Sequence, residues 1–467
     1  MFRAEKNIMQ IEKIEQGRVP DARPGSGGAV LAGARGARLV TLLYLIATLY
    51  FLMTFWGEWA EDFSAYYFAG YFYDLGEWDQ IYAGPPDVIG PEMPARWAEV
   101  LVELGEGSEN TYPFLYPPWA AAVMAPVTKI ITPQAAMNVL LVCNIALLYG
   151  SSYLAWRLMG RGRVGLSHWM LISLPVLAVT VQANFALVLG QIQLLVFFLC
   201  LLAVERYRSG TEISGALWLA LAACLKITPA AFAILFVWNR NWKALIAFTV
   251  ASLGGLGLSI LWTGWPLHEV FFDRMSTLNG LLFMSNVGVP WDAVIYQLVD
   301  LIRGTAPIYD SAEHVVPRPI WLELVVKSIF VAGLVVIWWR TRRMAQPDRV
   351  VAQFYALALL VPLAAPLAWV HYFMLPAYML PALVVRGTRG AVGQYLGFLI
   401  LFNMPVMLLI LETQLWGDMR VMLHMFVYVP FLSFMLAYAI RHPVGRVQDT
   451  DAEGSIARSV DPVPGRA

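Results

Sequence analysis

A carboxylate that follows directly on an apolar run is the first candidate for chemistry in this sequence. Residues 58–70 come after the apolar run 39–56 and carry three carboxylates, of which Asp62 stands one helical turn before Tyr66. A carboxylate backed by phenol rings at a membrane exit can be a solvated cap. It can also accept a proton from an attacking hydroxyl as a general base. The residues around Asp62 leave both interpretations open.

Four more polar residues lie within apolar segments, where polar side chains are costly and usually face a cavity or a partner. They are Gln191 and Gln193 in one short motif, Lys226 before Pro229, and His371. Helix–helix hydrogen bonds are the ordinary explanation for Gln193, and a hydrogen-bonded core histidine is the ordinary explanation for His371. Lys226 could extend to the lipid headgroups, but a cation at an opened helix bend is also suited to holding a phosphate.

Together, these groups would suit the transfer of a group from a lipid phosphate. The carboxylate would take the proton of the attacking hydroxyl, and cations would offset the charge that develops on the departing phosphate. No Gly-rich loop of the Walker or Rossmann type is present, which disfavours a soluble nucleotide as the donor. No spacing of His, Cys or carboxylates indicates a metal site, so we expect neither metal nor cofactor. A net charge of zero favours no class of partner, and we expect no nucleic acid.

The elements that must position these residues are membrane helices. The chain has 467 residues, of which 59% are hydrophobic and 14% are charged, whereas soluble domains carry about 25% charged residues. The apolar residues fall in blocks of roughly 17 to 25, the length at which a helix crosses about 30 Å of hydrocarbon. The sequence therefore predicts an all-α polytopic membrane protein embedded in a lipid bilayer.

The predicted organisation has a cytoplasmic leader at residues 1–38, an integral membrane domain at 39–441 and a cytoplasmic tail at 442–467, with both ends disordered. Two polar segments, 57–131 and 263–318, are expected as outer loops, and a helix is expected at 290–303 in the second. Spans are predicted at 39–56, 133–158, 166–181, 184–204, 242–262, 321–339, 351–367, 369–385, 393–411 and 419–440.

Clusters of Lys and Arg predict which loops face the cytoplasm, where such residues are enriched. They occur near residues 35–38, 157–163, 206–208, 340–343, 386–389 and 441. The remaining loops are then expected on the outer side of the cell membrane, including a segment at 412–418. That assignment sends Asp62, Gln191 and His371 to the outer side together.

One apolar block, 213–238, has basic residues at both ends and must therefore leave the cytoplasmic side and return. Pro229 lacks the backbone donor that a continuing helix needs. We predict two short helices, at 213–225 and 230–238, with Lys226 at the outward bend. Lys226 then lies on the same side as Asp62, which favours a shared site over scattered interfacial residues.

Ordered motifs in residues 39–262 resemble a known family. The motifs are Asp62-Phe-x-x-Tyr66, Ile81-Tyr82, Phe114-x-Tyr116-Pro-Pro118, Asn184, Gly190-Gln191 and Lys226-x-x-Pro229. Their order is similar to that of the membrane glycosyltransferases of the GT-C superfamily. More narrowly, it resembles glycosyltransferase family eighty-seven, the polyprenyl-phosphate-mannose-dependent α-mannosyltransferases of bacteria. The later half resembles the family mainly in its helix pattern and in His371, and the chain departs from the family's pattern at Gln193 and around residues 285–288.

The resemblance implies a GT-C-like fold with about 11–12 transmembrane or re-entrant helices and a large first outer loop. It implies that Asp62 is the catalytic base, and that Lys226 and His371 neighbour the donor phosphate. The substrate-binding positions that it implies are Tyr66, Tyr82, Tyr116, Asn184, Gln191, Lys226 and His371. The reaction implied is a metal-independent, inverting transfer of a hexose, here mannose, from a polyprenyl-phosphate donor to a glycan or glycolipid acceptor at the outer face.

Other functions remain open from the residues alone. A transporter or flippase of lipid-linked glycans would be expected to contain internal repeats with paired broken helices, whereas this sequence has one predicted broken helix and no clear repeat. A structural subunit of an envelope assembly would make the polar set coincidental. An O-antigen-ligase-like enzyme would place its chemistry in a late outer loop, but the earliest outer loop is the most acidic here.

Overall fold

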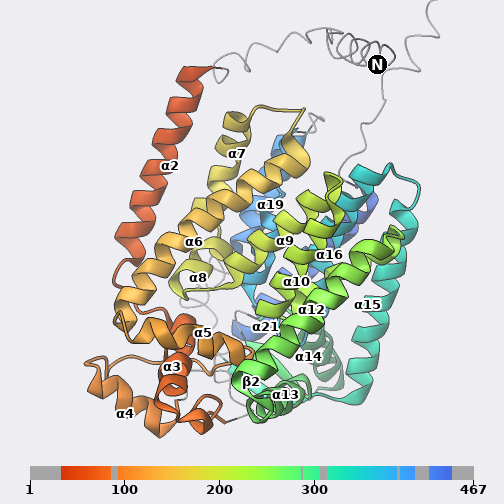
Figure 1. The fold of residues 1–467 in the computed structure, drawn as a ribbon. Coiled ribbons are helices and arrows are strands. Elements are labelled where there is room, and N and C mark those ends of the chain that lie inside the picture. The colour runs from red at the N-terminus through yellow and green to blue at the C-terminus, as the bar shows by residue number, and fades with distance from the viewer. Residues whose placement is uncertain are drawn as a thin grey trace, which may run out of the picture.

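The computed structural model shows a protein that is almost entirely helical (Figure 1). The residues it describes are 33–85, 93–285, 288–304, 313–385, 390–404 and 420–443. The expected leader up to residue 32, the tail beyond 443, the basic cluster at 386–389 and the expected outer segment at 412–418 lie outside the described residues. Within them, the prediction of an all-α polytopic fold is confirmed.

Five helices of the described chain are long and apolar enough to cross a membrane. They are α2 (Ala34–Phe55), α6 (Pro133–Ala155), α12 (Trp242–Thr263), α15 (Ile320–Thr341) and α16 (Gln346–Ala364). A bent pair, α7 (Leu166–Val179) and α8 (Val181–Val188), would be a sixth span, with a bend of 59°. In α12 and α15 only 17% of the most apolar window is buried, against 72% in α16, so α16 forms the centre of the bundle.

The remaining α-helices complete the structure, and most of them are shorter. They are α3 (Glu61–Leu75), α4 (Ala95–Glu103), α5 (Pro118–Thr128), α9 (Gln193–Arg208), α10 (Glu212–Leu225), α11 (Ile234–Trp238), α13 (Trp265–Asn279), α14 (Trp291–Arg303), α17 (Met374–Ala377), α18 (Pro381–Val385), α19 (Ala391–Phe402) and α21 (Arg420–Arg441). Several of the predicted spans are thus too short to cross a bilayer as single helices.

The break predicted at Lys226 is present, because α10 ends at Leu225 and a 3₁₀ turn (Thr228–Ala233) leads into α11. The span predicted at 184–204 is not a single helix. There α8 ends at Val188, and α9 begins only after a corner at Gly190, whose φ of 64° lies in the left-handed region.

The predicted span at 369–385 is also divided, into a 3₁₀ turn (Val370–Phe373), α17 and α18. Proline at the start of α18, at Pro381, fits a helix beginning there because its missing N–H is not needed in the first turn.

The second polar segment contains more regular structure than the one helix predicted at 290–303. Besides α14 it holds α13 and an antiparallel hairpin of β1 (Leu281–Ser285) and β2 (Glu313–Pro317), in which Leu281 pairs with Pro317. The hairpin was not predicted because β1 is nearly all apolar and buried, so it lacks the alternation that identifies a half-buried strand.

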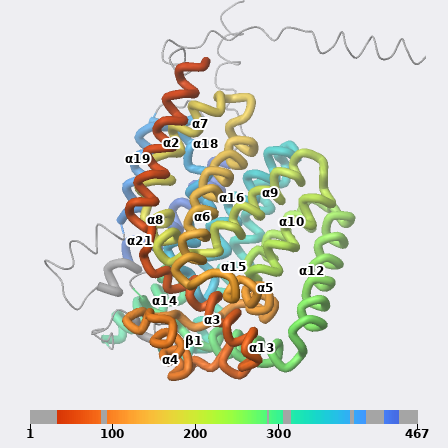
Figure 2. The backbone as a smooth tube through the Cα atoms, turned by 60° about the vertical axis from the view of Figure 1, so that its left-hand side comes forward, coloured from red at the N-terminus to blue at the C-terminus, as the bar shows by residue number. Residues whose placement is uncertain are grey.

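The two polar segments that were predicted as outer loops, 57–131 and 263–318 (the outer segments), lie at the same end of the helical bundle, where α3, α4, α13 and β1 gather (Figures 1 and 2). A core of aromatic side chains, including Phe68, Phe72 and Trp97, packs the first of these segments. At the other end, two of the basic clusters meet, because the Arg208 guanidinium donates to the carbonyl of Leu158 at 2.7 Å. The fold thus separates an end with several basic clusters from an end with the two outer segments.

Candidate functional site

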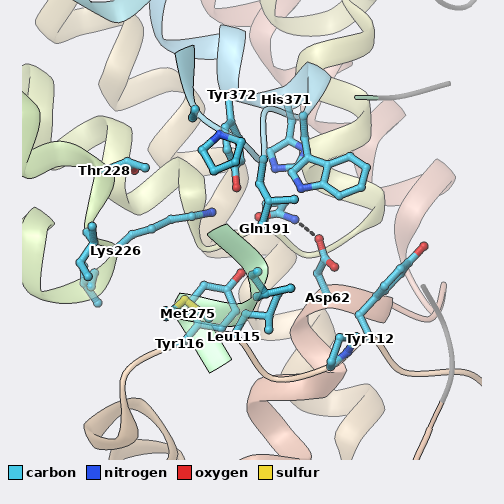
Figure 3. Close-up of a pocket in the computed structure, with 18 of the residues that line it drawn as sticks. Asp62, Tyr112, Leu115, Tyr116, Gln191, Lys226, Thr228, Met275, His371 and Tyr372 are labelled. Atoms are coloured by element: carbon cyan, nitrogen blue, oxygen red, sulfur yellow. Dashed lines mark hydrogen bonds between the residues drawn. The ribbon is translucent and has the colours of Figure 1, made fainter. Parts of the chain in front are cut away.

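A cavity of about 290 Å³ lies where the first outer segment meets the broken helices. Asp62, Gln191, Lys226 and His371, the four residues that the topology sends to one side, all line it (Figure 3). These residues come from α3, the α8–α9 corner, the α10 break and the 3₁₀ turn before α17. The fold therefore brings Asp62 and His371, which are more than 300 residues apart in the sequence, to the same cavity.

The start of α3 positions Asp62. It lies in the first turn of α3, where the unpaired backbone N–H groups favour acidic side chains. The N–H of Phe63 donates to the carbonyl of Leu189 at 3.3 Å, which fixes α3 against the α8–α9 corner. A Cβ on Gly190 would come within 2.7 Å of the Ala60 Cβ, so only glycine allows this approach.

Gln191 connects that corner to the carboxylate. Its side-chain Nε2 donates a hydrogen bond to Oδ2 of Asp62 (Figure 3). The backbone carbonyl of Gln191 accepts from Nδ2 of the buried Asn144 at 3.2 Å, so α6 holds the corner from behind. Its Oε1 is buried and has no partner among the described residues, which leaves an acceptor available for a bound hydroxyl.

The environment of Asp62 makes it a stronger base than an ordinary aspartate. Burial raises the pKa of Asp62 to about 7, the charge of Lys226 opposes that rise, and the neighbouring Glu61 adds to it. A carboxyl group with a pKa near neutrality is matched to proton transfer at physiological pH. The cavity can therefore supply a base that ionises only in part at pH 7.

Lys226 enters the cavity from the side opposite Asp62 (Figure 3). Its backbone is extended, with φ −150° and ψ 133°, because α10 has ended and Pro229 starts the next turn. Its Nζ lies 4.5 Å from the ring centroid of Tyr372 and 5.7 Å from that of Tyr116. The two rings hold the ammonium group in the cavity by cation–π contacts.

The three predicted tyrosines occupy different layers. Tyr116 lines the cavity, and it stands in a bend of the chain directly before Pro117 and Pro118. Tyr66 lies behind Tyr116, with ring centroids 4.0 Å apart. The Tyr82 hydroxyl donates to the Tyr116 carbonyl at 2.6 Å. Tyr66 and Tyr82 thus support Tyr116 and do not line the cavity, although all three were predicted to bind substrate.

His371 is buried in the cavity wall, with 2% of its surface exposed. Its ring stacks on Phe185 at a centroid distance of 6.2 Å and contacts Tyr372 edge-on. Neither ring nitrogen has a hydrogen-bond partner among the described residues. A purely structural histidine is normally hydrogen-bonded, so this geometry supports a contact between His371 and a ligand.

Asn184 and Gln193 lie outside this cavity. The Asn184 amide donates to the carbonyls of Ala178 and Thr180, at 3.1 and 2.9 Å, and so bridges the bend between α7 and α8. Gln193 begins α9 and lines a second cavity of about 30 Å³, which Tyr372 separates from the first. Nothing places the Asn184 side chain against a ligand in the main cavity.

Sequence reasoning missed several lining residues. Tyr372 contacts Lys226. It directly follows His371 in the sequence, and this adjacency could have identified it as a lining residue. Phe271, Met275 and Leu278 form one apolar face of α13 along the cavity, and their i, i+4, i+7 spacing could have identified that face. Among the described residues, no group of three or more His, Cys, Asp or Glu could hold a metal ion.

Comparison with known proteins identifies the family. The model of Glycosyltransferase family 87 matches residues 114–366, more than half of the chain. The chain belongs to this family. Membership makes it a membrane glycosyltransferase and removes the transporter and structural-subunit alternatives. Asp62 and His371 lie outside the matched range, so their roles rest on the geometry described above.

Named relatives come from mycobacteria. A Mycobacterium tuberculosis protein named polyprenol-phosphate-mannose-dependent alpha-(1-2)-phosphatidylinositol pentamannoside mannosyltransferase is 25% identical over 315 residues, covering 65% of this chain and 67% of that protein. Another from the same species, named as the corresponding phosphatidylinositol mannoside mannosyltransferase, is 23% identical and covers 60% of this chain and 62% of its own length. A Mycolicibacterium smegmatis pentamannoside mannosyltransferase is 24% identical, covering 65% and 70%. No solved structure matches the chain.

Proposed function

We propose that this glycosyltransferase moves a mannosyl residue from a polyprenyl-phosphate donor to a hydroxyl of a glycan or glycolipid acceptor on the outer face of the cell membrane. The relatives' names give polyprenol-phosphate-mannose as the donor and phosphatidylinositol mannosides as acceptors. The observation that carries the proposal for this chain is the shared cavity, in which a buried carboxylate and a lysine enter from opposite sides.

In the proposed reaction, an acceptor hydroxyl attacks the anomeric carbon of mannose while the bond from that carbon to the phosphate oxygen breaks. Asp62 accepts the proton of the hydroxyl, and the electron pair of the broken bond leaves with the polyprenyl phosphate. The attack comes from the face opposite the phosphate, so the configuration at the anomeric carbon inverts.

Asp62 is suited to this role by its hydrogen bond as well as by its pKa. Gln191 engages Oδ2, which leaves Oδ1 to receive the acceptor hydroxyl. The hydrogen bond also fixes the rotation of the carboxylate, and fixed geometry is a large part of the advantage of a positioned base. The unpartnered Oε1 of Gln191 can accept from a neighbouring sugar hydroxyl at the same time.

Lys226 and His371 are proposed to hold the phosphate side of the donor. An ammonium group stabilises the charge that grows on the departing phosphate, and this interaction is stronger in a cavity that excludes water. The ring nitrogens of His371 lack protein partners, so a phosphate oxygen or the hydroxyl of a sugar would satisfy one of them. Tyr116 offers a ring face to the sugar between the two sides.

The outer-face orientation is supported by the basic residues at the opposite end of the bundle. Labelling from outside the cell can test it, in a variant whose three natural cysteines are replaced. A cysteine at the exposed Glu99, in the first outer segment, should react with a membrane-impermeant maleimide, and a cysteine at the exposed Arg161 should not. The reverse pattern would invert the topology.

The donor is tested by reconstituting the purified protein in liposomes with labelled polyprenyl-phosphate mannose and a mycobacterial phosphatidylinositol mannoside fraction. We expect labelled mannose to appear in the glycolipid, and nucleotide-linked mannose to give no product. Transfer from the nucleotide sugar without polyprenyl phosphate would refute the proposed donor. Transfer to a different glycan but not to the phosphatidylinositol mannosides would leave the donor proposal intact and correct the acceptor.

A further inference from the structure

Four arginines surround a cavity of about 210 Å³ at the end of the molecule that the proposed reaction does not use. Arg340, Arg342 and Arg343 come from the end of α15, and Arg441 comes from the end of α21. The exposed ring of Trp339 forms part of the wall. Two helices that are far apart in the sequence therefore bring four positive charges to one hollow.

No described carboxylate neutralises these four arginines by an ion pair. Other arginines at the same end do have acidic partners. Arg157 pairs with Glu205 at 2.6 Å, and Arg208 lies 3.9 Å from Asp348. Like charges around one cavity repel each other. The arrangement becomes favourable when an anion enters the cavity.

The length of α15 places the cavity where lipid headgroups are expected. The 22 residues of α15 start just after β2, at the end that holds the outer segments, and a helix of that length spans about 33 Å. The end of α15 therefore reaches the opposite boundary of the hydrocarbon. Trp339 is 54% exposed there, as is usual for tryptophans at the membrane interface.

We propose that this cavity binds the headgroup of an anionic phospholipid that carries two phosphodiesters, such as a diphosphatidylglycerol. Guanidinium groups match the geometry of phosphate oxygens and can contact them in pairs, and basic pockets between transmembrane helices on this side are suited to such headgroups. The bound lipid would hold the ends of α15 and α21 together. The proposal does not depend on the sugar, the donor or the acceptor of the reaction.

The test is a titration of the purified full-length protein with cardiolipin, followed by native mass spectrometry, with phosphatidylcholine as the neutral lipid. The double variant Arg342→Gln/Arg441→Gln removes one charge from each helix. At about 1 kcal/mol per arginine, its dissociation constant for cardiolipin should rise roughly 30-fold. The matched control Arg240→Gln/Lys243→Gln removes two exposed charges near the start of α12 and should bind as the wild type does.

Three outcomes would overturn the proposal. Equal weakening in both double variants would show general surface attraction and no site. Cardiolipin binding no tighter than phosphatidylcholine binding in the wild type would show that the cavity has no preference for an anionic lipid. The tail carries Asp449, Asp451 and Glu453, so binding that appears only after these three are changed to Asn, Asn and Gln would identify the tail as the occupant.

Discussion

Two interrupted helices deliver polar side chains to the same cavity by different means. At Lys226, the chain leaves the helix because Pro229 starts a new turn, and the lysine extends from an open strand-like segment. At Gly190, no proline is present, and the corner exists because the backbone packs against α3. One break is encoded locally and the other depends on a tertiary contact.

The difference matches the chemistry that each break would serve. In the proposed reaction Lys226 reaches a lipid phosphate, and two tyrosine rings contact its ammonium group by cation–π interactions. Gln191 must hold a carboxylate in one orientation, and its corner is fixed from three directions, by Asn144, Phe63 and Ala60. Perturbing the two breaks should therefore affect different kinetic constants.

Among changes at the two breaks, the largest effect is expected from Gly190→Ala. An added Cβ would overlap with Ala60 at 2.7 Å and Phe63 at 2.9 Å, and a φ of 64° would be strained for alanine. The corner should move away from α3 and take Gln191 out of reach of Asp62. We expect kcat to fall about 10²-fold, since a shift of about 1 Å in a catalytic constellation has that cost.

Gly76→Ala is the matched control for that prediction. Gly76 ends α3 with a φ of 76°, but nothing lies within 4 Å of the position of its Cβ. This variant has the same backbone strain without the overlap, so it should lose stability and keep most of its kcat. Equal losses of kcat in the two variants would mean that strain alone, and not contact with α3, explains the effect of Gly190→Ala.

The next effect concerns the other break. Lys226→Met should lower kcat/KM for the polyprenyl-phosphate donor by about 30-fold, because one charged contact to the phosphate contributes about 2 kcal/mol. The KM for the acceptor should stay the same, as should all constants in the exposed-lysine control Lys243→Met. If the KM for the acceptor rises instead, Lys226 belongs to the acceptor side of the cavity.

A smaller effect, and a change in pH dependence, is expected from Gln191→Ala. The wild-type rate should rise with pH around a midpoint near 7, because only the ionised form of Asp62 accepts a proton. Losing the hydrogen bond from Gln191 removes stabilisation of the ionised form and raises the pKa of Asp62. The rate at pH 7 should fall about tenfold and recover at higher pH. Gln193→Ala, outside the main cavity, should leave the midpoint unchanged, and a loss in Gln191→Ala that is the same at every pH would refute this role.

The sequence alone predicted those features that depend on short stretches of residues or on the distribution of charge. Membrane-length apolar blocks predicted the class of fold, and the proline after Lys226 predicted the broken helix. The charge distribution grouped Asp62, Gln191, Lys226 and His371, which do line one cavity. Each of these inferences needed only the length of a segment, the geometry of one residue type or the sign of a charge.

Features that depend on packing could not be obtained in this way. Tyr66 was predicted to bind substrate from its place in the motif that begins at Asp62, but Tyr116 lines the cavity and its ring packs on Tyr66. Asn184 was predicted to bind substrate from its place among the motifs, whereas its amide bridges a helix bend. The first outcome depends on a contact between residues 50 positions apart, and the second depends on the bend between α7 and α8.

The most direct test of the central claim, that Asp62 is the base of the transfer step, is a single-turnover measurement with donor already bound. The adjacent carboxylate Glu61 provides the control, since it shares the first turn of α3 but does not line the cavity. Asp62→Asn should slow transfer by about 10²- to 10⁴-fold, while Glu61→Gln should transfer at close to the wild-type rate. A folded Asp62→Asn protein that transfers mannose as fast as Glu61→Gln would contradict the account.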